Sequence, residues 1–194
     1  MSPASPSRYT GVAIALHWIV ALLIIGGFSL GLTMTDMRVS PTKLQYFSWH
    51  KWIGITVFLL ALARLLWRLR SPDPALPDSM PRWQRVVAKM SHVLLYVLML
   101  VIPISGWLFS SADGVPVVYL GHIPLPDLVA PDKAFAKTLK GIHHDLNWIL
   151  LAAVIGHVVA ALEHHFIARD DILRRMLPRL SRTSRDPVPP EQLG

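Results

Sequence analysis

Four long apolar stretches divide the chain, with few polar residues on any face of them. They cover residues 12–32, 52–66, 93–112 and 148–162. A helix needs about 20 apolar residues to cross a bilayer core of about 30 Å, and flanking residues extend the shorter stretches. The pattern predicts an all-α integral membrane four-helix bundle, with helices at about 9–34, 48–70, 86–112 and 141–168. A buried bundle of a soluble protein is the alternative, but four such stretches leave too little polar surface for it.

Polar and proline-rich segments connect these stretches. The segment SPDPALPDSMP follows the second stretch and cannot be helical throughout, because proline breaks helices. The connection at 35–47 should be short, whereas residues 113–140 form a longer segment whose GVPVVYLGHIPLP part can pack over the mouth of the bundle. We expect residues 1–180 to form one membrane domain and residues 181–194 to form a cytoplasmic tail.

Charge and composition narrow the class of protein. The net charge is +7 with histidine neutral, and cysteine is absent, which excludes disulfides, iron–sulfur clusters and covalent c-type haem attachment. Thirteen Lys and Arg residues fall at the ends expected inside and six at the opposite ends, so the positive-inside rule places both termini in the cytoplasm. The basic tail does not indicate nucleic-acid binding, because it is short, rich in proline and lacks stacking aromatics after Phe166. We expect no nucleic-acid partner.

The last apolar stretch carries histidines on one helical stripe. His143 and His157 are fourteen residues apart, 40° short of four turns, so both project from nearly one face about 21 Å apart. His164 follows seven residues later, close to the same line, whereas His144 points roughly 100° away from His143. Two imidazoles near opposite sides of a bilayer core suggest two stacked cofactors.

The other stretches also contribute histidines, in two layers. His50 joins His143 in the outer layer, while His17 and His92 both lie at the depth of His157. Depth alone does not decide between His17 and His92. Two facing imidazoles with both axial positions filled suit a b-type haem that transfers electrons, whereas zinc usually takes more ligands close together.

A glycine or an arginine lies fourteen residues after three of these histidines, on the same helical face. This spacing leads to Gly31 from His17, to Arg64 from His50 and to Gly106 from His92. Glycine leaves room for a large flat ring, and arginine on such a face can pair with a haem propionate.

The chain resembles the bacterial cytochrome b561 family of four-helix dihaem membrane proteins. The resemblance covers roughly residues 8 to 180, and it is carried by RYTGVAIALHW, HKWIGITVFLLALARLLWRLRSP, HHDLNWILLAAVIGHVVAALEHHF and DDILRRMLPR. It implies that His17 and His157 ligate the iron of the inner haem and that His50 and His143 ligate the outer one. His92 is not a ligand in that scheme. The resemblance places the protein in the bacterial inner membrane.

Some members of that family oxidise superoxide on the outer side and reduce ubiquinone. The resemblance therefore favours a superoxide:quinone oxidoreductase, with His92 and His164 as candidates for hydrogen bonds to quinone. Lysines on the outer side can form a cationic mouth that steers a small anion. Lysines that are simply exposed to solvent in loops explain the same pattern equally well. The candidate residues for the mouth are Lys133, Lys137 and Lys140, with Lys43 and Lys51 nearby.

Two other functions stay open at this point. The protein is then either an electron-shuttle cytochrome b subunit of a hydrogenase or dehydrogenase, or a metal or proton transporter that uses the histidine stripe. Steady reduction of quinone by superoxide with the purified protein alone distinguishes an oxidoreductase from an electron-shuttle subunit. A colourless purified protein without a Soret band indicates the transporter.

Overall fold

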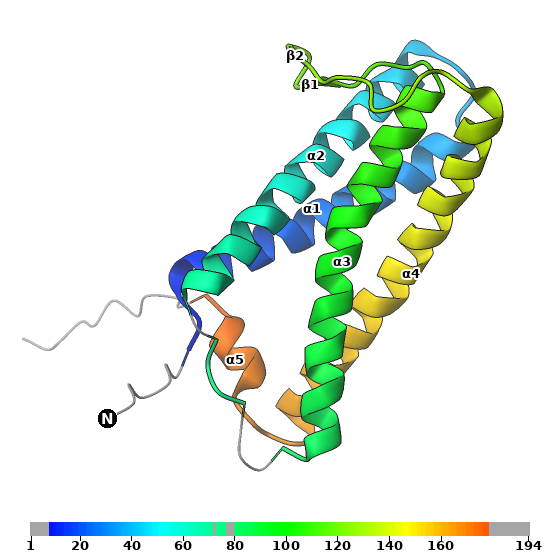
Figure 1. Cartoon of the computed structure of the whole chain (residues 1–194). Coiled ribbons are helices and arrows are strands. Elements are labelled where there is room, and N and C mark those ends of the chain that lie inside the picture. The colour runs from blue at the N-terminus through cyan, green and yellow to red at the C-terminus, as the bar shows by residue number, and fades with distance from the viewer. Residues whose placement is uncertain (1–7, 72, 77–79, 179–194) are drawn as a thin grey trace, which may run out of the picture.

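The computed structural model describes residues 8–71, 73–76 and 80–178. Four long helices make up most of it: α1 (Gly11–Asp36), α2 (Pro41–Arg70), α3 (Arg82–Ala112) and α4 (Lys133–Phe166). They run up and down in antiparallel order (Figure 1). Each contains a window with mean hydropathy between 1.7 and 2.3, long enough to cross a membrane. The multi-pass membrane bundle predicted from the sequence is confirmed.

Short elements mark the two ends of the bundle. Strands β1 (Val118–Tyr119) and β2 (Ile123–Pro124) pair as an antiparallel hairpin at one end. The short helix α5 (Ile172–Met176), which the sequence pattern did not predict, lies at the other (Figure 1). We call these the hairpin end and the α5 end. The expected tail at 181–194, with Arg182 and Arg185, lies outside the described residues, as does Arg179.

Helices α2 and α4 begin seven to eight residues before the predicted positions near 48 and 141. Ser40 caps α2 by accepting a hydrogen bond from the backbone N–H of Lys43, and Pro41 occupies the first turn. Serine followed by proline is a helix-start signal. Most of the expected loop at 35–47 is therefore helical.

Asp132 caps α4 in the same way. Its carboxylate accepts hydrogen bonds from the backbone N–H groups of Ala134 and Phe135, at 2.9 and 3.0 Å. Replacing Asp132 with alanine should lower the stability of the detergent-solubilised protein by about 1 kcal/mol, since two N–H groups lose their acceptor. Thermal unfolding of this variant and of Asp127→Ala, which removes an exposed loop carboxylate, measures the effect. Equal melting temperatures would contradict it.

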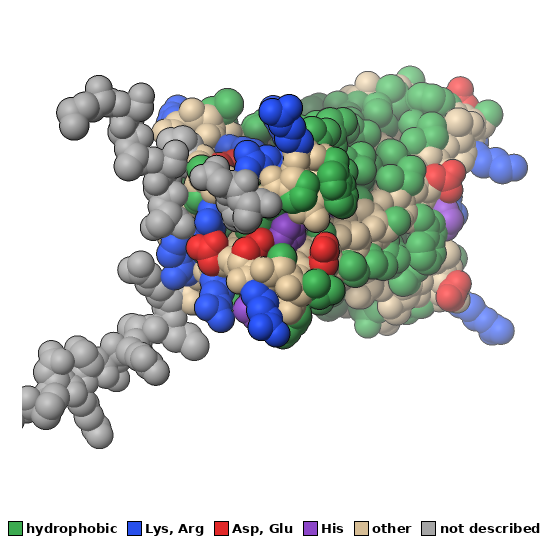
Figure 2. Space-filling model, turned by 90° about the horizontal axis from the view of Figure 1, so that it is seen from below, with side chains coloured by type: hydrophobic (Ala, Val, Ile, Leu, Met, Phe, Trp, Pro, Cys, Tyr) green, Lys and Arg blue, Asp and Glu red, His purple; other side chains and the backbone are tan. Residues whose placement is uncertain are grey.

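The helices pack as α1 with α2, α2 with α3, and α3 with α4. The buried core is small: Val20, Val57, Ala61 and Met99 form one cluster, and Leu98, Ile102 and Leu150 form another. Many large apolar side chains are exposed instead, among them Leu22 and Leu59. Figure 2 shows a broad hydrophobic surface between charged side chains at the two ends. That surface is suited to contact with lipid.

Candidate functional site

Three histidines meet in the half of the bundle nearer α5. His17 of α1 faces His157 of α4, with ring centres 6.2 Å apart. His92 of α3 contacts the same His157 ring, with centres 5.4 Å apart. The Nδ1 atom of His17 is buried without a hydrogen-bond partner. A buried imidazole nitrogen without a partner is unfavourable unless something else satisfies the ring.

A second pair lies toward the hairpin end. His50 of α2 faces His143 of α4, with ring centres 6.1 Å apart and the rings nearly perpendicular. His50 Nδ1 donates a hydrogen bond to the Gly27 carbonyl at 2.9 Å. His143 Nδ1 lies 3.1 Å from the Ile102 carbonyl and 2.9 Å from Ser105 Oγ.

These hydrogen bonds set the tautomer of the hairpin-end pair. A carbonyl oxygen only accepts, so each Nδ1 must carry the proton. The Nε2 atom of each neutral ring then keeps its lone pair. Histidines that ligate metals show this arrangement, in which the second ring nitrogen donates to a carbonyl. Both histidines are candidates from the sequence, whereas Ser105, two residues after Pro103 in α3, is not. No pattern in the sequence indicated that contact.

The separation within each facing pair matches that of two imidazoles on opposite sides of one metal ion. A metal–nitrogen bond of about 2.0 Å plus about 1.2 Å from nitrogen to ring centre gives about 6.4 Å between ring centres. The measured values for His17–His157 and His50–His143 are 6.2 and 6.1 Å. The shorter His92–His157 separation corresponds to direct edge contact of the rings. The two layers of histidines expected from the sequence are present in the structure.

Two mostly apolar spaces adjoin the hairpin-end pair, and both are lined by His50, His143, Gly54 and Pro103. One, of about 500 Å³, extends toward Val57 and Leu98. The other, of about 570 Å³, lies toward the hairpin. Cofactor sites typically have such apolar linings with a few polar groups. The lining around the pair therefore suits a largely apolar cofactor.

The two glycines of the fourteen-residue stride lie against imidazoles. A Cβ atom on Gly106 would lie 3.0 Å from Cε1 of His143, and one on Gly31 would lie 3.4 Å from Cε1 of His50. Each glycine therefore makes room for the histidine of the hairpin-end pair. The fourteen-residue spacing instead relates Gly106 to His92 and Gly31 to His17, and predicts that both glycines leave room for the cofactor ring. Helical phase alone does not show which neighbouring helix is closest.

Arg64 lies in the half of the bundle that holds His17. Its guanidinium carbon is 5.4 Å from the Tyr96 ring centre, and Arg68 approaches the same ring at 5.7 Å. Arg68 also forms a 2.7 Å ion pair with Asp73. In the part of the chain that the structure describes, no carboxylate lies within 4.0 Å of Arg64. Arg64 is thus free to pair with a cofactor carboxylate.

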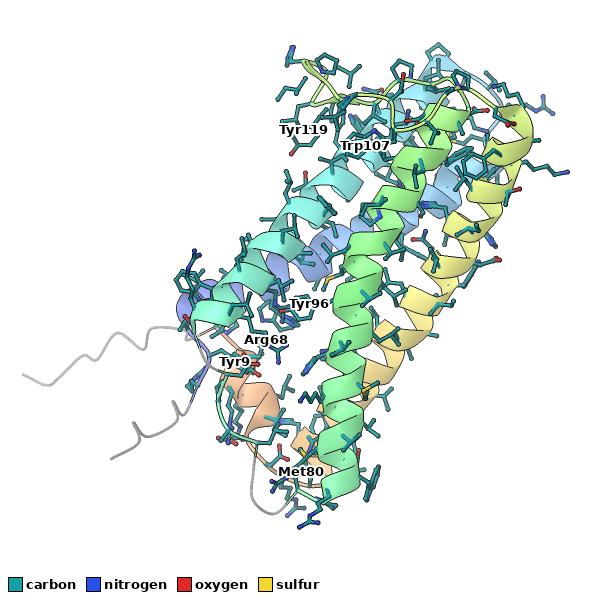
Figure 3. The ribbon with its side chains drawn as sticks, viewed as in Figure 1. Tyr9, Arg68, Met80, Tyr96, Trp107 and Tyr119 are labelled. Atoms are coloured by element: carbon teal, nitrogen blue, oxygen red, sulfur yellow. The ribbon has the colours of Figure 1, made fainter. Side chains whose placement is uncertain are left out.

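Figure 3 shows Tyr9, Arg68 and Tyr96 gathered at the α5 end. Burial, and secondarily the nearby Asp73 carboxylate, raise the pKa of the Tyr9 phenol. Arg8 and Trp18 donate hydrogen bonds to carbonyls of Arg174 and Met176, which fix the α5 segment against the start of α1. These two segments lie far apart along the chain, and only the tertiary structure shows that they are in contact.

Two further histidine candidates have local partners. His164 Nδ1 lies 2.6 Å from Asp170 Oδ2, and both side chains are largely buried. His144 lies on the exposed side of α4, where its Nδ1 is 3.1 Å from Asp145 and its Nε2 accepts from Trp148. His144 therefore points away from the histidine pairs, as its helical phase predicted.

The lysines proposed for anion steering lie on one exposed face of α4. Lys133, Lys137 and Lys140 follow a spacing of four and three residues, which places them on one stripe. That stripe is displaced from the face that carries His143, and Lys133 is already bonded to Asp113 at 2.8 Å. Lys51 instead lines the hairpin-end space beside His50.

Comparison with known proteins shows the family to which the chain is similar. Residues 8–179 match the family model for prokaryotic cytochrome b561. Cytochrome b561 homolog 2 of Escherichia coli is 36% identical, with 91% of this chain and 95% of that protein covered. Homolog 1 of the same organism is 32% identical, with coverages of 89% and 98%. A probable superoxide oxidase CybB of Yersinia pestis is 31% identical, with coverages of 89% and 97%.

The histidine pairs, the apolar space and the four membrane-length helices thus occur in a chain that matches one family over nearly its whole length. The resemblance stated from the sequence is confirmed by the match over residues 8–179. This chain belongs to the prokaryotic cytochrome b561 family, whose members bind b-type haem and transfer electrons in the membrane.

Proposed function

We propose that the protein holds two b-type haems, one between His17 and His157 and the other between His50 and His143. The observation that carries this proposal is the ring-centre separation of 6.2 and 6.1 Å in the two pairs. Because α4 supplies one histidine to each pair fourteen residues apart, the two sites that would hold the haems are separated by about 21 Å along α4. Bound haem supplies one-electron redox chemistry, and the protein supplies ligation, spacing and an apolar surround.

The proposed reaction is the oxidation of superoxide at the hairpin end, coupled to the reduction of ubiquinone. Two superoxide ions each give up one electron and leave as dioxygen, and one quinone takes up two electrons and two protons to form the quinol. The similarity to a probable superoxide oxidase of Yersinia pestis favours this reaction over other electron transfers. The purified protein without any partner should therefore reduce ubiquinone when superoxide is supplied.

We infer that quinone binds near the α5-end pair, where His92 and His164 are the candidate contacts. His164 donates Nδ1–H to Asp170, so its Nε2 can accept a hydrogen bond or pass on a proton. His92 contacts His157 and has no hydrogen-bond partner among the described residues. In the same region Arg64 is the candidate partner for a propionate of the α5-end haem.

The proposed orientation places the α5 end in the cytoplasm of a bacterium and the hairpin end outside its inner membrane. Of the described Lys and Arg residues, ten belong to the α5 end and six to the hairpin end. The ten are Arg8, Arg64, Arg68, Arg70, Arg82, Arg85, Lys89, Arg169, Arg174 and Arg175. Protease accessibility of tags at either terminus in oriented membrane vesicles tests this.

Haem stoichiometry tests the proposal directly. The detergent-purified protein should give a pyridine haemochrome value of two haems per chain and a reduced-minus-oxidised spectrum of low-spin b haem. A fully loaded preparation with one haem would contradict the second site. If two haems are present but superoxide does not reduce quinone, the protein acts as an electron-shuttle subunit for another enzyme. A preparation without a Soret band would favour a histidine-lined transporter.

The exposed lysines of α4 provide a test of anion steering. Changing Lys133, Lys137 and Lys140 together to glutamine should slow the reaction with superoxide about threefold to tenfold at low salt and flatten its salt dependence. Lys133 should contribute least because Asp113 already neutralises it. Stopped-flow rates across ionic strength measure this, with the charge-matched Arg70, Arg82 and Lys89 triple variant at the α5 end as control. Identical salt slopes in the two variants would refute steering.

A further inference from the structure

Lys51 is the single charged side chain among the described residues that line the two spaces beside the hairpin-end pair. It follows His50 in α2 and lines the larger space together with His50 and His143. The remaining lining is apolar except for Ser110, Asn147 and the histidines. A cation on the edge of an apolar space is unfavourable unless an anion or several hydrogen bonds compensate it.

The hydrogen bonding of Lys51 leaves most of its capacity unused. Its Nζ donates one long hydrogen bond, of 3.3 Å, to the Pro116 carbonyl. An ammonium group has three donors, and within the described ranges no carboxylate lies within 4.0 Å of this one. Other lysines at the hairpin end are held more tightly: Lys43 by the Met37 carbonyl at 2.6 Å and Lys133 by Asp113 at 2.8 Å.

The segment above Lys51 is fixed along α2. The Trp52 indole N–H donates to the Val118 carbonyl at 2.7 Å, and the Tyr119 hydroxyl lies 3.0 Å from the Thr56 hydroxyl. Figure 3 places Tyr119 and Trp107 at this end of the molecule. With the chain at 116–119 held in place, Lys51 both bonds to this segment at Pro116 and lines the space beside the histidines.

We propose that Lys51 binds a propionate carboxylate of the haem held by His50 and His143. This inference rests on the proposed function, since it requires a haem in that space. A b haem is apolar apart from its iron and its two propionates, and the space offers one charged side chain to them. A charge-assisted hydrogen bond from Lys51 both neutralises the carboxylate and uses the free ammonium donors. Lys51 thereby fixes which edge of the haem faces the hairpin.

Charge-neutral variants of Lys51 test this. In Lys51→Gln the haem of the His50–His143 pair should transfer to apomyoglobin about tenfold faster, because a charge-assisted hydrogen bond is lost. The midpoint potential of that haem should fall, since a nearby positive charge favours the reduced state. Lys51→Met, which keeps the length and apolar stem of the side chain, should do the same, and Lys51→Arg should restore both values.

Lys43→Gln is the matched control, with the same charge removed from the same helix at the same end. It should leave haem transfer and both potentials unchanged. The His143→Ala variant identifies which of the two potentials belongs to the hairpin-end haem. Redox-difference infrared spectra provide a direct readout, since carboxylate bands should change in Lys51→Gln and remain in Lys43→Gln.

Several results would overturn the assignment. They are unchanged haem transfer and infrared bands in both Lys51→Gln and Lys51→Met, equal effects of Lys43→Gln, or failure of Lys51→Arg to restore the wild-type values. A change confined to the superoxide rate would show that Lys51 meets a solvent anion instead. Each of these leaves the wild-type count of two haems intact, whereas a count below two refutes the proposed function itself.

Discussion

The His157→Ala variant should bind about one haem per chain instead of two, with the remaining haem showing an unchanged low-spin spectrum. His157 faces His17 with a ring-centre separation of 6.2 Å, and the variant leaves one side of that site without an imidazole. Haem stoichiometry and a redox titration measure the loss. The titration should show one midpoint potential where the wild type shows two.

Two neighbouring histidines sharpen this test. His92→Ala should keep both haems, because the His92 ring contacts the edge of His157 and does not face it across a metal-sized gap. His144→Ala should also keep both, since His144 lies on the exposed face of α4. Because His92 is close enough to move into the vacated place, the double variant His92→Ala, His157→Ala belongs in the set. Two haems in that double variant would refute the assignment of His157.

The Gly106→Val variant should lose the haem between His50 and His143 while the other haem remains. A Cβ on Gly106 would already lie 3.0 Å from Cε1 of His143, and the two methyl groups of valine add further bulk. His143 is hydrogen-bonded to the Ile102 carbonyl and to Ser105, both on α3, the helix that carries Gly106. Its ring therefore cannot move aside without losing those bonds. Overpacking of this kind forces side chains out of position.

Gly156→Val is the control for this prediction. Gly156 lies in α4, also in the membrane part of the bundle, and a Cβ there meets no atom within 4 Å. It should retain both haems and nearly wild-type potentials. The number of haems per chain, with the spectrum of the haem that remains, is measured in both variants. Equal losses in the two variants would mean that valine disturbs these helices generally rather than the His143 ring.

The bundle follows from local sequence properties. Each apolar stretch, extended by its flanking residues where it is short, is long enough to cross a bilayer, and the helical phase of His143 and His157 requires only the geometry of one helix. Helix starts at Ser40 and Asp132 also carry local signals, which the hydropathy pattern concealed because residues 41–47 and 133–140 extend beyond the membrane-length stretches. Those starts were predictable from capping chemistry alone.

Other features depend on contacts between helices. Gly31 lies against His50 and Gly106 lies against His143. These contacts join different helices, so residue spacing along a single helix cannot predict them. The separate positions of His17 and His92 relative to His157 emerge in the same way, because both residues lie at one depth in the sequence pattern. Lys51 and Lys133 look alike as sequence, yet one lines the space beside the histidines and the other is paired with Asp113.

The sequence by itself determined a four-helix membrane bundle with histidines in two layers, since length, hydropathy and helical periodicity are properties of single segments. Tertiary structure alone decided which histidine faces which, which nitrogen keeps its lone pair, and which lysine adjoins the apolar space. The physical reason is that these depend on how helices distant in sequence rotate and pack against one another, and several packings share the same periodicity.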